Sequence, residues 1–391
     1  MKSKDIIAVI EPVGGHGGLD YYDFNMLNSI KMQHGYDANL YTCDETSEYE
    51  SVELVYKNIY GETNKFIRGL NYVKGTLFAL LDAKRRSAKI VHLHFVDFGF
   101  LEYYNLILAK KVFGFRVVGT VHDVESFEKY AKGDSSRHNY EKFLTLLDAA
   151  VLHTEYAKNE LVKNLKSNIV DAKKIETIYG PDFDVESLDS NFIEKNVARE
   201  HLNLPQDRKI ILFFGQIKKV KGLDLLLKAL AEVAKKEPSV LLVIAGKVWK
   251  DDYSEYENII EEYGLANYVD QRIGYVNNDD VPHYFNAADL VVLPYRKIYN
   301  SGVLIRSMSF GTPVLASDFG PFKEFIIPGK NGFLFEAENV ESLAENLHEI
   351  MADMTSLKQV SLEERASIKE HFALDSIGKQ YCDLYESVLN M

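Results

Sequence analysis

Short apolar segments alternate with longer amphipathic segments twice along this chain of 391 residues. The apolar segments are rich in Val, Ile and Phe and are short enough to be buried strands. Strands that alternate with helices in this way build a parallel sheet with helices on both faces. In the first half we expect strands at Asp5–Ile10, Ala38–Thr42, Lys89–Phe95, Phe115–Val121 and Asp148–His153, and helices at Tyr21–His34 and Phe66–Arg86.

The second half repeats the alternation from about residue 208 onward. Strands are expected at Lys209–Phe214, Ser239–Ala245, Val269–Ile273, Asp289–Pro294 and Pro313–Ala316. The segment Lys221–Lys236 is expected to be a helix with one buried face. The apolar residues at helical spacing there are Leu223, Leu226, Leu227, Leu230 and Val233. Leu374–Leu389 has the pattern of a second amphipathic helix.

These patterns predict an α/β protein of two Rossmann-like, doubly wound domains. Residues 1–185 form the first domain, residues 186–370 the second, and residues 371–391 a final helix. The polar stretch Pro181–Pro205 is the expected boundary. Ligands of open α/β sheets bind outside the carboxyl ends of the strands, so we expect a ligand cleft between the two domains.

Composition excludes several classes of protein. Lys and Arg number 45 and Asp and Glu 58, which gives a net charge of −13 and argues against a nucleic-acid-binding protein. Cys43 and Cys382 are too few for a disulfide scaffold or a cysteine-rich zinc site, and they fit a reducing compartment. The apolar run Ile6–Ile10 is too short for a signal peptide, and no segment is long enough to span a membrane. A cytoplasmic protein, or one that rests on the inner face of the membrane, is expected.

The stretch Pro294–Gly311 has the features of a phosphate-binding turn. A strand ends at Pro294, Ser301 stands where a helix N-cap belongs, and Gly311 is placed to end the helix. Gly302 would let a ligand approach the backbone at the helix start. A helix N-terminus at a ligand cleft favours an anionic group such as phosphate. An ordinary capped helix explains the same residues.

The stretch Phe213–Leu223 is a second turn of this kind. It has a strand, a glycine and a helix start, and it carries Lys218, Lys219 and Lys221. Basic side chains there would neutralise a diphosphate leaving group. The alternative is a solvated run of charges on a loop.

The turn Gly215–Gly222 with its Leu-rich helix resembles the glycine–basic–Lys-Gly turn of family 4 glycosyltransferases, which have the GT-B fold. Further segments follow the family pattern in order and spacing over residues 208–336: Ala245-Gly246, Gly274-Tyr275-Val276, Asn286-Ala287-Ala288-Asp289, Ser309–Ala316 and Asn331–Leu334. The first half is similar to the family through Gly14–Gly18 and Thr120–Asp123. The final helix resembles the one that crosses back to the first domain in this fold.

The resemblance implies transfer of a sugar from a nucleotide-diphosphate donor, with the nucleotide on the second domain and the acceptor mainly on the first. Lys221 matches the lysine that contacts the diphosphate, and Lys218 would add a second charge because Gln216 stands where many members have Arg. His122 matches a histidine that faces the donor sugar. Donor-binding positions are Gly215, Gln216, Gly246, Lys247, Tyr275, Val276, Asn300, Ser301, Gly302, Val303 and Arg306. No cofactor or metal would be needed, because lysines and a helix terminus supply the positive charge.

One departure from the family pattern concerns two glutamates that are usually eight residues apart. Arg306 and Ile298 occupy these positions here. The second glutamate normally contacts the ribose and the first lies near the donor sugar, so both contacts must differ. Tyr299 or Asn300 could fill the space. The donor identity and the stereochemistry therefore stay open.

The glycine-rich segment Gly14–Gly18 follows the first strand and is expected to be a flexible loop that a substrate can approach closely. It has neither the spacing of a dinucleotide fingerprint nor a P-loop lysine. In the resemblance it lies on the acceptor side; the candidate acceptor-binding residues are Gly15, His16, Gly17 and Gly18. Asp20 is expected at the next helix start, as a helix cap or as a catalytic group.

His92 and His94 alternate on a strand, so their side chains are expected on one face of the sheet. They could form a metal pair, but no third ligand has convincing spacing. A structural role is therefore favoured over zinc.

The segment Lys65–Lys89 is basic and aromatic on an otherwise acidic chain. It could contact anionic lipid and bring the protein to a lipid-linked acceptor. The alternative is an amphipathic helix whose apolar face packs on the sheet.

Three functions remain. The first is a hexosyltransferase with a glycan, lipid-linked or other glycoconjugate acceptor. If the reaction inverts, Asp20 or Asp123 must take the acceptor proton; if it retains, the diphosphate can take it. The second is a non-catalytic glycosyltransferase-like subunit that binds a partner or a glycan. The third is a nucleotide-sugar epimerase, but the sequence lacks the extra carboxylates and histidines that epimerase chemistry requires.

Overall fold

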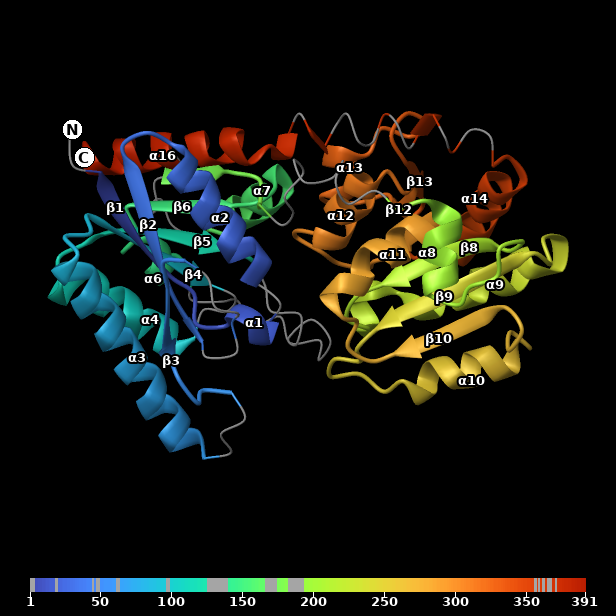
Figure 1. Ribbon diagram of the computed structural model, residues 1–391, viewed down its shortest axis with the longest axis horizontal. Coiled ribbons are helices and arrows are strands. Elements are labelled where there is room, and N and C mark those ends of the chain that lie inside the picture. The colour runs from blue at the N-terminus through green and yellow to red at the C-terminus, as the bar shows by residue number, and fades with distance from the viewer. Residues whose placement is uncertain are drawn as a thin grey trace. The chain divides into compact units, whose positions relative to one another are not determined.

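The computed structural model describes residues 4–17, 20–43, 46, 50–60, 64–95, 99–124, 140–165, 174–181, 193–354, 357, 359–360, 363, 368–369 and 371–391. The chain divides into two compact units. The first comprises Met1–Asp184 with Phe372–Met391, and the second comprises Val185–His371. Each unit contains one parallel sheet with helices between its strands, as the apolar pattern predicts (Figure 1).

The first unit has a seven-stranded sheet of order β3-β2-β1-β4-β5-β6-β7, in which every described pair is parallel. Its strands are β1 (Asp5–Ile10), β2 (Tyr36–Cys43), β3 (Val52–Tyr56), β4 (Ile90–Phe95), β5 (Arg116–Val121), β6 (Ala149–Leu152) and β7 (Ile175–Thr177). The five predicted strands are confirmed. β3 and β7 were not predicted, because these edge strands are short and only partly buried and so lack the continuous apolar pattern.

The helices of the first unit are α1 (Gly14–Gly17), α2 (Asp20–Met32), α3 (Lys65–Arg85), α4 (Phe100–Ile107), the π-helix η1 (Leu108–Val112), α6 (Tyr140–Leu144), α7 (Glu155–Lys163) and α16 (Leu374–Leu389). The predicted helices at Tyr21–His34, Phe66–Arg86 and Leu374–Leu389 correspond to α2, α3 and α16. The prediction of a flexible loop at Gly14–Gly18 is wrong for Gly14–Gly17, because these residues form helix α1. Gly18 lies outside the described residues.

Helix α16 packs beside α2 within the first unit (Figure 1). The contact is very close: a Cβ on Gly378 would lie 1.9 Å from the backbone oxygen of Ser29. The hydroxyls of Tyr22 and Tyr381 are 3.2 Å apart. The end of the chain is therefore part of the core of the first unit.

The second unit has a six-stranded sheet of order β10-β9-β8-β11-β12-β13. Its strands are β8 (Lys209–Phe214), β9 (Val240–Gly246), β10 (Val269–Ile273), β11 (Leu290–Leu293), β12 (Val314–Ser317) and β13 (Phe333–Phe335). Its helices are α8 (Lys195–His201), η4 (Lys219–Lys221), α9 (Leu223–Lys236), α10 (Ser254–Glu262), η5 (Asn278–Asp280), α11 (Val281–Ala287), α12 (Gly302–Phe310), α13 (Phe322–Phe325) and α14 (Val340–Ala352). The strand order reverses between β8 and β11, where Rossmann-like sheets bind ligands.

The predicted apolar face of α9 is confirmed, since all five of its named Leu and Val residues are buried. The helix begins at Leu223 instead of Lys221, because Gly222 adopts a left-handed backbone with φ 66°. The boundary stretch also contains α8, whose Arg199 is buried and bonds to Asp289 at 2.8 Å. Because such buried contacts of α8 are polar, its sequence shows no periodic pattern of apolar residues.

Among the described residues, no helix combines the length and the apolar character that a membrane crossing requires.

Candidate functional site

The loop that follows β8 is held against the loops after β9 and β11. The Ile217 N–H donates to the Lys247 carbonyl at 2.9 Å, and the Trp249 N–H donates back to the Ile217 carbonyl at 3.0 Å. On the other side, a Cβ on Gly222 would lie 2.0 Å from the Pro294 carbonyl oxygen. Three loops at the carboxyl edge of the second sheet therefore form one connected surface.

The closest contact between these loops is the one between Gly246 and Gly215. Gly246 has φ 155°, and a Cβ built on it would lie 1.9 Å from the Gly215 carbonyl oxygen. The Gly215 N–H donates to the Ala245 carbonyl at 2.9 Å, so the two loops cannot separate without breaking the sheet. Two of the predicted donor-binding residues are thus glycines that the local packing requires.

Lys221 projects onto this surface. Its Nζ and Val303 Cγ2 lie 3.3 and 3.4 Å from the position that a Cβ on Gly215 would take. The same Nζ is 5.1 Å from the centroid of the Tyr295 ring. The structure therefore brings together three of the predicted donor-site residues, from the turns after β8 and β11.

The charge of Lys221 is not compensated: no carboxylate is paired with it within the described part of the chain. Burial, assisted by the charge of Lys218, lowers the pKa of Lys221 to about 7. An anion at this position would restore the positive charge, because it offsets the cost of desolvation. The uncompensated ammonium group at this position is suited to an anionic group.

The first turn of α12 completes the surface. The Ser301 side chain accepts a hydrogen bond from the Leu304 N–H at 3.2 Å, which confirms the predicted N-cap. Gly311 ends the helix with φ 70°, also as predicted. Gly302 is exposed and Val303 half-buried. The N–H groups of a first helical turn have no partner within the helix, so they are available to an anion.

Aromatic side chains border the lysines. Lys218 Nζ lies 5.9 Å from the ring centroid of Trp249, the only tryptophan of the chain. Tyr275 follows β10 and is 77% exposed, while Gln216 and Val276 are half-buried and Lys247 is exposed. Trp249 was missed by sequence reasoning; its place just after a buried strand, close to Gly246, was the available signal.

The residues at the glutamate positions have different surroundings. Ile298 is buried, and so is Tyr299, whereas Asn300 is half-buried. Of the two residues expected to fill the vacated space, only Asn300 keeps part of its surface exposed. Arg306 is half-buried on α12, four residues beyond its first residue, Gly302.

In the first unit, Glu11 organises the predicted acceptor segment. The buried Glu11 carboxylate accepts hydrogen bonds from the N–H groups of Val13 and Gly14, and the Gly15 N–H donates to Thr46 Oγ1 at 2.9 Å. Burial raises the pKa of Glu11 to about 7. The glycine segment is therefore a capped helical turn. The side chains of His16 and Asp20 lie outside the described residues, although α2 begins at Asp20 as predicted.

Histidines gather behind this turn, at the carboxyl edge of the first sheet. His92 and His94 lie on one face as predicted, with ring centroids 5.3 Å apart. His92 contacts the Tyr385 hydroxyl at 2.7 Å and the Thr120 hydroxyl at 2.8 Å, so both ring nitrogens have protein partners. This favours the structural role over zinc.

His122, the predicted catalytic histidine, belongs to the same cluster. Its Nε2 lies 3.4 Å from His94 Nδ1, which lies 3.6 Å from Asp23 Oδ1. Burial and the neighbouring histidines hold the pKa of His122 well below its usual range. A neutral imidazole can orient a sugar hydroxyl by hydrogen bonding but cannot supply positive charge.

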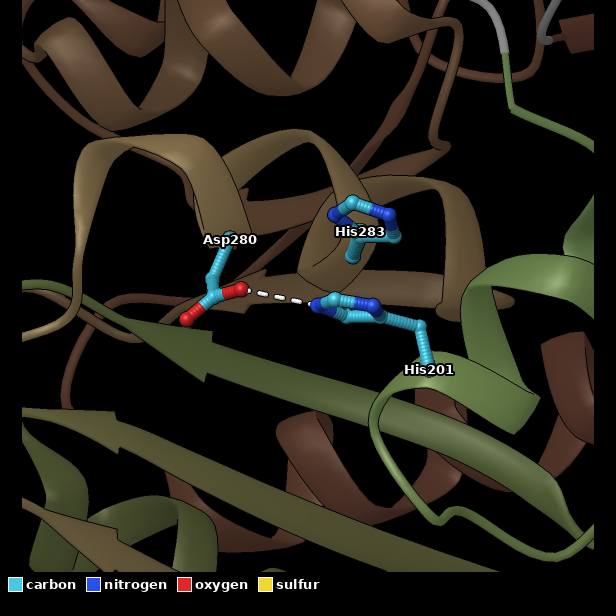
Figure 2. A group of neighbouring side chains, drawn as sticks. All are labelled: His201, Asp280 and His283. Atoms are coloured by element: carbon cyan, nitrogen blue, oxygen red, sulfur yellow. Dashed lines mark hydrogen bonds and ion pairs between the residues drawn. The ribbon is translucent and has the colours of Figure 1, made fainter.

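A separate group, which sequence reasoning missed, consists of His201, Asp280 and His283 (Figure 2). His201 Nε2 donates to Asp280 Oδ1 at 2.8 Å, and the two imidazole rings stack with centroids 3.8 Å apart at 18°. These are residue types that bind Zn²⁺. The lone pairs of a ring nitrogen lie in the ring plane, so nearly parallel stacked rings do not direct them at one point. The geometry is that of a partly exposed hydrogen bond between His201 and Asp280, with the His283 ring stacked on it.

Comparison with known proteins finds a family match within the second unit. Residues 194–370 match the family described as glycosyl transferases group 1. The match includes every predicted donor-site residue, and it confirms the resemblance to GT-B glycosyltransferases that the sequence motifs indicated.

Relatives of the chain include an uncharacterized glycosyltransferase of Methanocaldococcus jannaschii, 25% identical over 67% of the chain and 66% of that protein. The chain spans 49% to 66% of the length of the first curated relatives that it matches.

Solved structures show the same fold over the whole chain. Sucrose-phosphate synthase from Thermosynechococcus elongatus has a TM-score of 0.80 at 18% identity, covering 99% of this chain and all of that one. Anabaena HepE in complex with UDP and glucose has a TM-score of 0.75 at 17% identity, covering 98% and 100%. The chain therefore has the two-domain, Rossmann-like GT-B fold.

Proposed function

We propose that this protein transfers a hexose from a nucleotide-diphosphate sugar to a hydroxyl group of a glycan, lipid-linked or other glycoconjugate acceptor, without a bound metal. The observation that carries the proposal is the position of Lys221 Nζ beside Gly215 and Val303 at the switch point of the second sheet. An uncompensated ammonium group next to a helix N-terminus is suited to a diphosphate. Anabaena HepE, which has this fold, was solved with UDP and glucose.

The bond changes follow from this placement. The acceptor oxygen forms a bond to the anomeric carbon while the bond from that carbon to the diphosphate oxygen breaks. The negative charge that develops on the leaving diphosphate is stabilised by Lys221, Lys218 and the first turn of α12. The acceptor proton goes to a first-unit carboxylate in an inverting reaction, or to the departing diphosphate in a retaining one. Neutral His122 orients the sugar by hydrogen bonding.

The alternative is a non-catalytic glycosyltransferase-like subunit. The observation that favours it is the replacement of both family glutamates, by buried Ile298 and half-buried Arg306. The intact anion site around Lys221 opposes it. The two differ in what they do with a donor: the enzyme releases a nucleoside diphosphate, and the subunit does not.

Thermal unfolding with UDP, GDP, dTDP, ADP and CMP tests the donor site. A ligand that binds only the folded chain raises the midpoint by mass action. We expect one diphosphate to raise the midpoint more than the others and more than CMP, and its base then narrows the search for the sugar. If none of the five changes the midpoint, the donor-site assignment is wrong.

The affinity for the preferred diphosphate is expected to fall as the pH rises above about 7. In the free protein, Lys221 loses its proton there. Diphosphate favours the charged form, so binding raises the pKa of Lys221, and affinity decreases about tenfold per pH unit between the two pKa values. Isothermal titration between about pH 7.5 and 9 measures this, above the range in which phosphate itself takes up a proton. Lys221→Arg stays charged, so its affinity is expected to be flat; an equally steep decline in that variant would contradict the assignment.

A further inference from the structure

Helix α3 has two apolar faces, and only one of them is covered. The covered face comprises Tyr72, Gly75, Thr76, Ala79, Leu80, Asp82 and Ala83. On the other face large apolar side chains are exposed: Phe66 80%, Ile67 42%, Leu70 45%, Leu77 36%, Phe78 55% and Leu81 60%. The expectation that the apolar residues of this segment pack on the sheet therefore holds for only part of them. Figure 1 shows α3 at the lower left edge of the first unit.

These six exposed side chains lie along one side of the helix, in two groups on either side of Lys74. At about 100° per residue they fall within an arc of about 120° on the helix surface. From Phe66 to Leu81 they extend about 22 Å along the helix axis. A row of exposed apolar side chains of this length marks a binding surface more often than ordinary solvent-facing surface. We call these six residues the α3 strip.

The charges along the α3 strip are all positive. Lys74, Lys84 and Arg85 lie in the same arc and are exposed. The only acid of the helix, Asp82, is buried and paired with Arg85 at 2.7 Å and Arg86 at 2.6 Å. Lys65 and Arg68 add two exposed cations in the first turn. On a chain of net charge −13, this is a local cationic surface.

We propose that the α3 strip docks this protein on an anionic lipid bilayer. The helix lies in the plane of the interface, with Phe66, Phe78 and Leu81 among the acyl chains and the lysine and arginine head groups at the lipid phosphates. Long basic side chains can reach outward past the apolar groups they border. The acidic remainder of the chain is repelled by the same surface, so the strip also sets which side of the first unit faces the lipid.

Charge distinguishes lipid from a second copy of the chain. Two identical α3 strips facing each other would bring like charges together, which costs free energy. Anionic head groups instead complement the exposed Lys74 and Lys84 in the same arc. The proposal rests on α3 alone and is independent of the transfer reaction.

Vesicle sedimentation tests the proposal. The full chain is mixed with vesicles of phosphatidylcholine alone, or of phosphatidylcholine with phosphatidylglycerol. We expect at least about tenfold stronger binding to the anionic vesicles. Phe78→Ser with Leu81→Ser, and separately Lys74→Glu, are each expected to weaken that binding about tenfold or more. All three side chains are exposed, so the fold should be retained.

Matched controls replace exposed residues of the second unit. Val197→Ser removes an apolar side chain that is 49% exposed on α8, and Lys236→Glu reverses a charge at the end of α9. Both should bind vesicles like the wild type. Equal binding by all variants, or no binding by the wild type, overturns the proposal. So does lipid-free ultracentrifugation that shows a dimer for the wild type and monomers for the α3 variants, because the strip is then a protein interface.

The stabilisation of each variant by nucleoside diphosphate is measured in parallel. A docking variant that keeps this stabilisation is folded, so its loss of vesicle binding reports on α3. If no diphosphate stabilises the wild type or any variant, the proposed function is wrong. If vesicle binding still behaves as expected in that case, the docking inference stands.

Discussion

Lys221→Ala is expected to lower the rate of hexose transfer by about 10²–10³-fold and to abolish the stabilisation by nucleoside diphosphate. The ammonium group lies beside the Gly215 backbone and the first turn of α12, where the leaving diphosphate would sit. Its charge counts most when the bond to the anomeric carbon breaks, so kcat should fall more than KM rises. Release of the diphosphate from a donor identified by the thermal panel measures the rate.

Lys236→Ala is the matched control for this variant. Lys236 ends α9, the helix whose start follows Lys221, and it is exposed. Its removal takes away one positive charge from the same unit without touching the candidate site. Equal losses in the two variants would show that net charge, and not the position of Lys221, governs the reaction. Full activity of Lys221→Ala would refute the assignment.

Gly246→Ala is expected to destabilise the second unit by about 3 kcal/mol and to eliminate donor binding. The added Cβ would lie 1.9 Å from the carbonyl oxygen of Gly215, so one of the two loops must move. That movement breaks the hydrogen bond from the Gly215 N–H to Ala245 and shifts the surface beside Lys221. For a unit of this size, the midpoint should fall by roughly 6–12 °C.

The variant Gly264→Ala is a control that introduces backbone strain without a steric clash. Gly264 has φ 65°, but nothing lies within 4 Å of its Cβ position. Its replacement should cost only about 1 kcal/mol and leave donor binding intact. Urea unfolding of both variants, with diphosphate titration of each, provides the comparison. If the two lose similar stability and Gly246→Ala still binds diphosphate, the contact with Gly215 is not what holds the donor surface together.

The sequence predicted the elements that carry a continuous signal. The strands of both sheets with long apolar runs, the buried face of α9 and the Ser301 cap were all predicted correctly, because burial and capping leave local patterns. The edge strands β3, β7 and β13 were missed, because partial burial weakens that pattern. α8 was missed because its buried contacts are polar.

The candidate site was predicted less completely. Lys221 and Gly246 could be named from short motifs, since both lie where strands end. Glu11 and Asp23 could not, because their importance depends on which loops and helices meet in space. The lowered pKa values of Lys221 and His122 likewise arise from burial, which no local spacing encodes.

The division of the chain has a consequence for its synthesis. The second unit is one continuous segment, Val185–His371, inserted between two parts of the first. It can therefore fold on the ribosome as soon as it has emerged, whereas the first unit must wait for α16. Until then, the places of Tyr381 and Tyr385 beside Tyr22 and His92 stay open. The earliest-made half of the protein is therefore the last to complete its core.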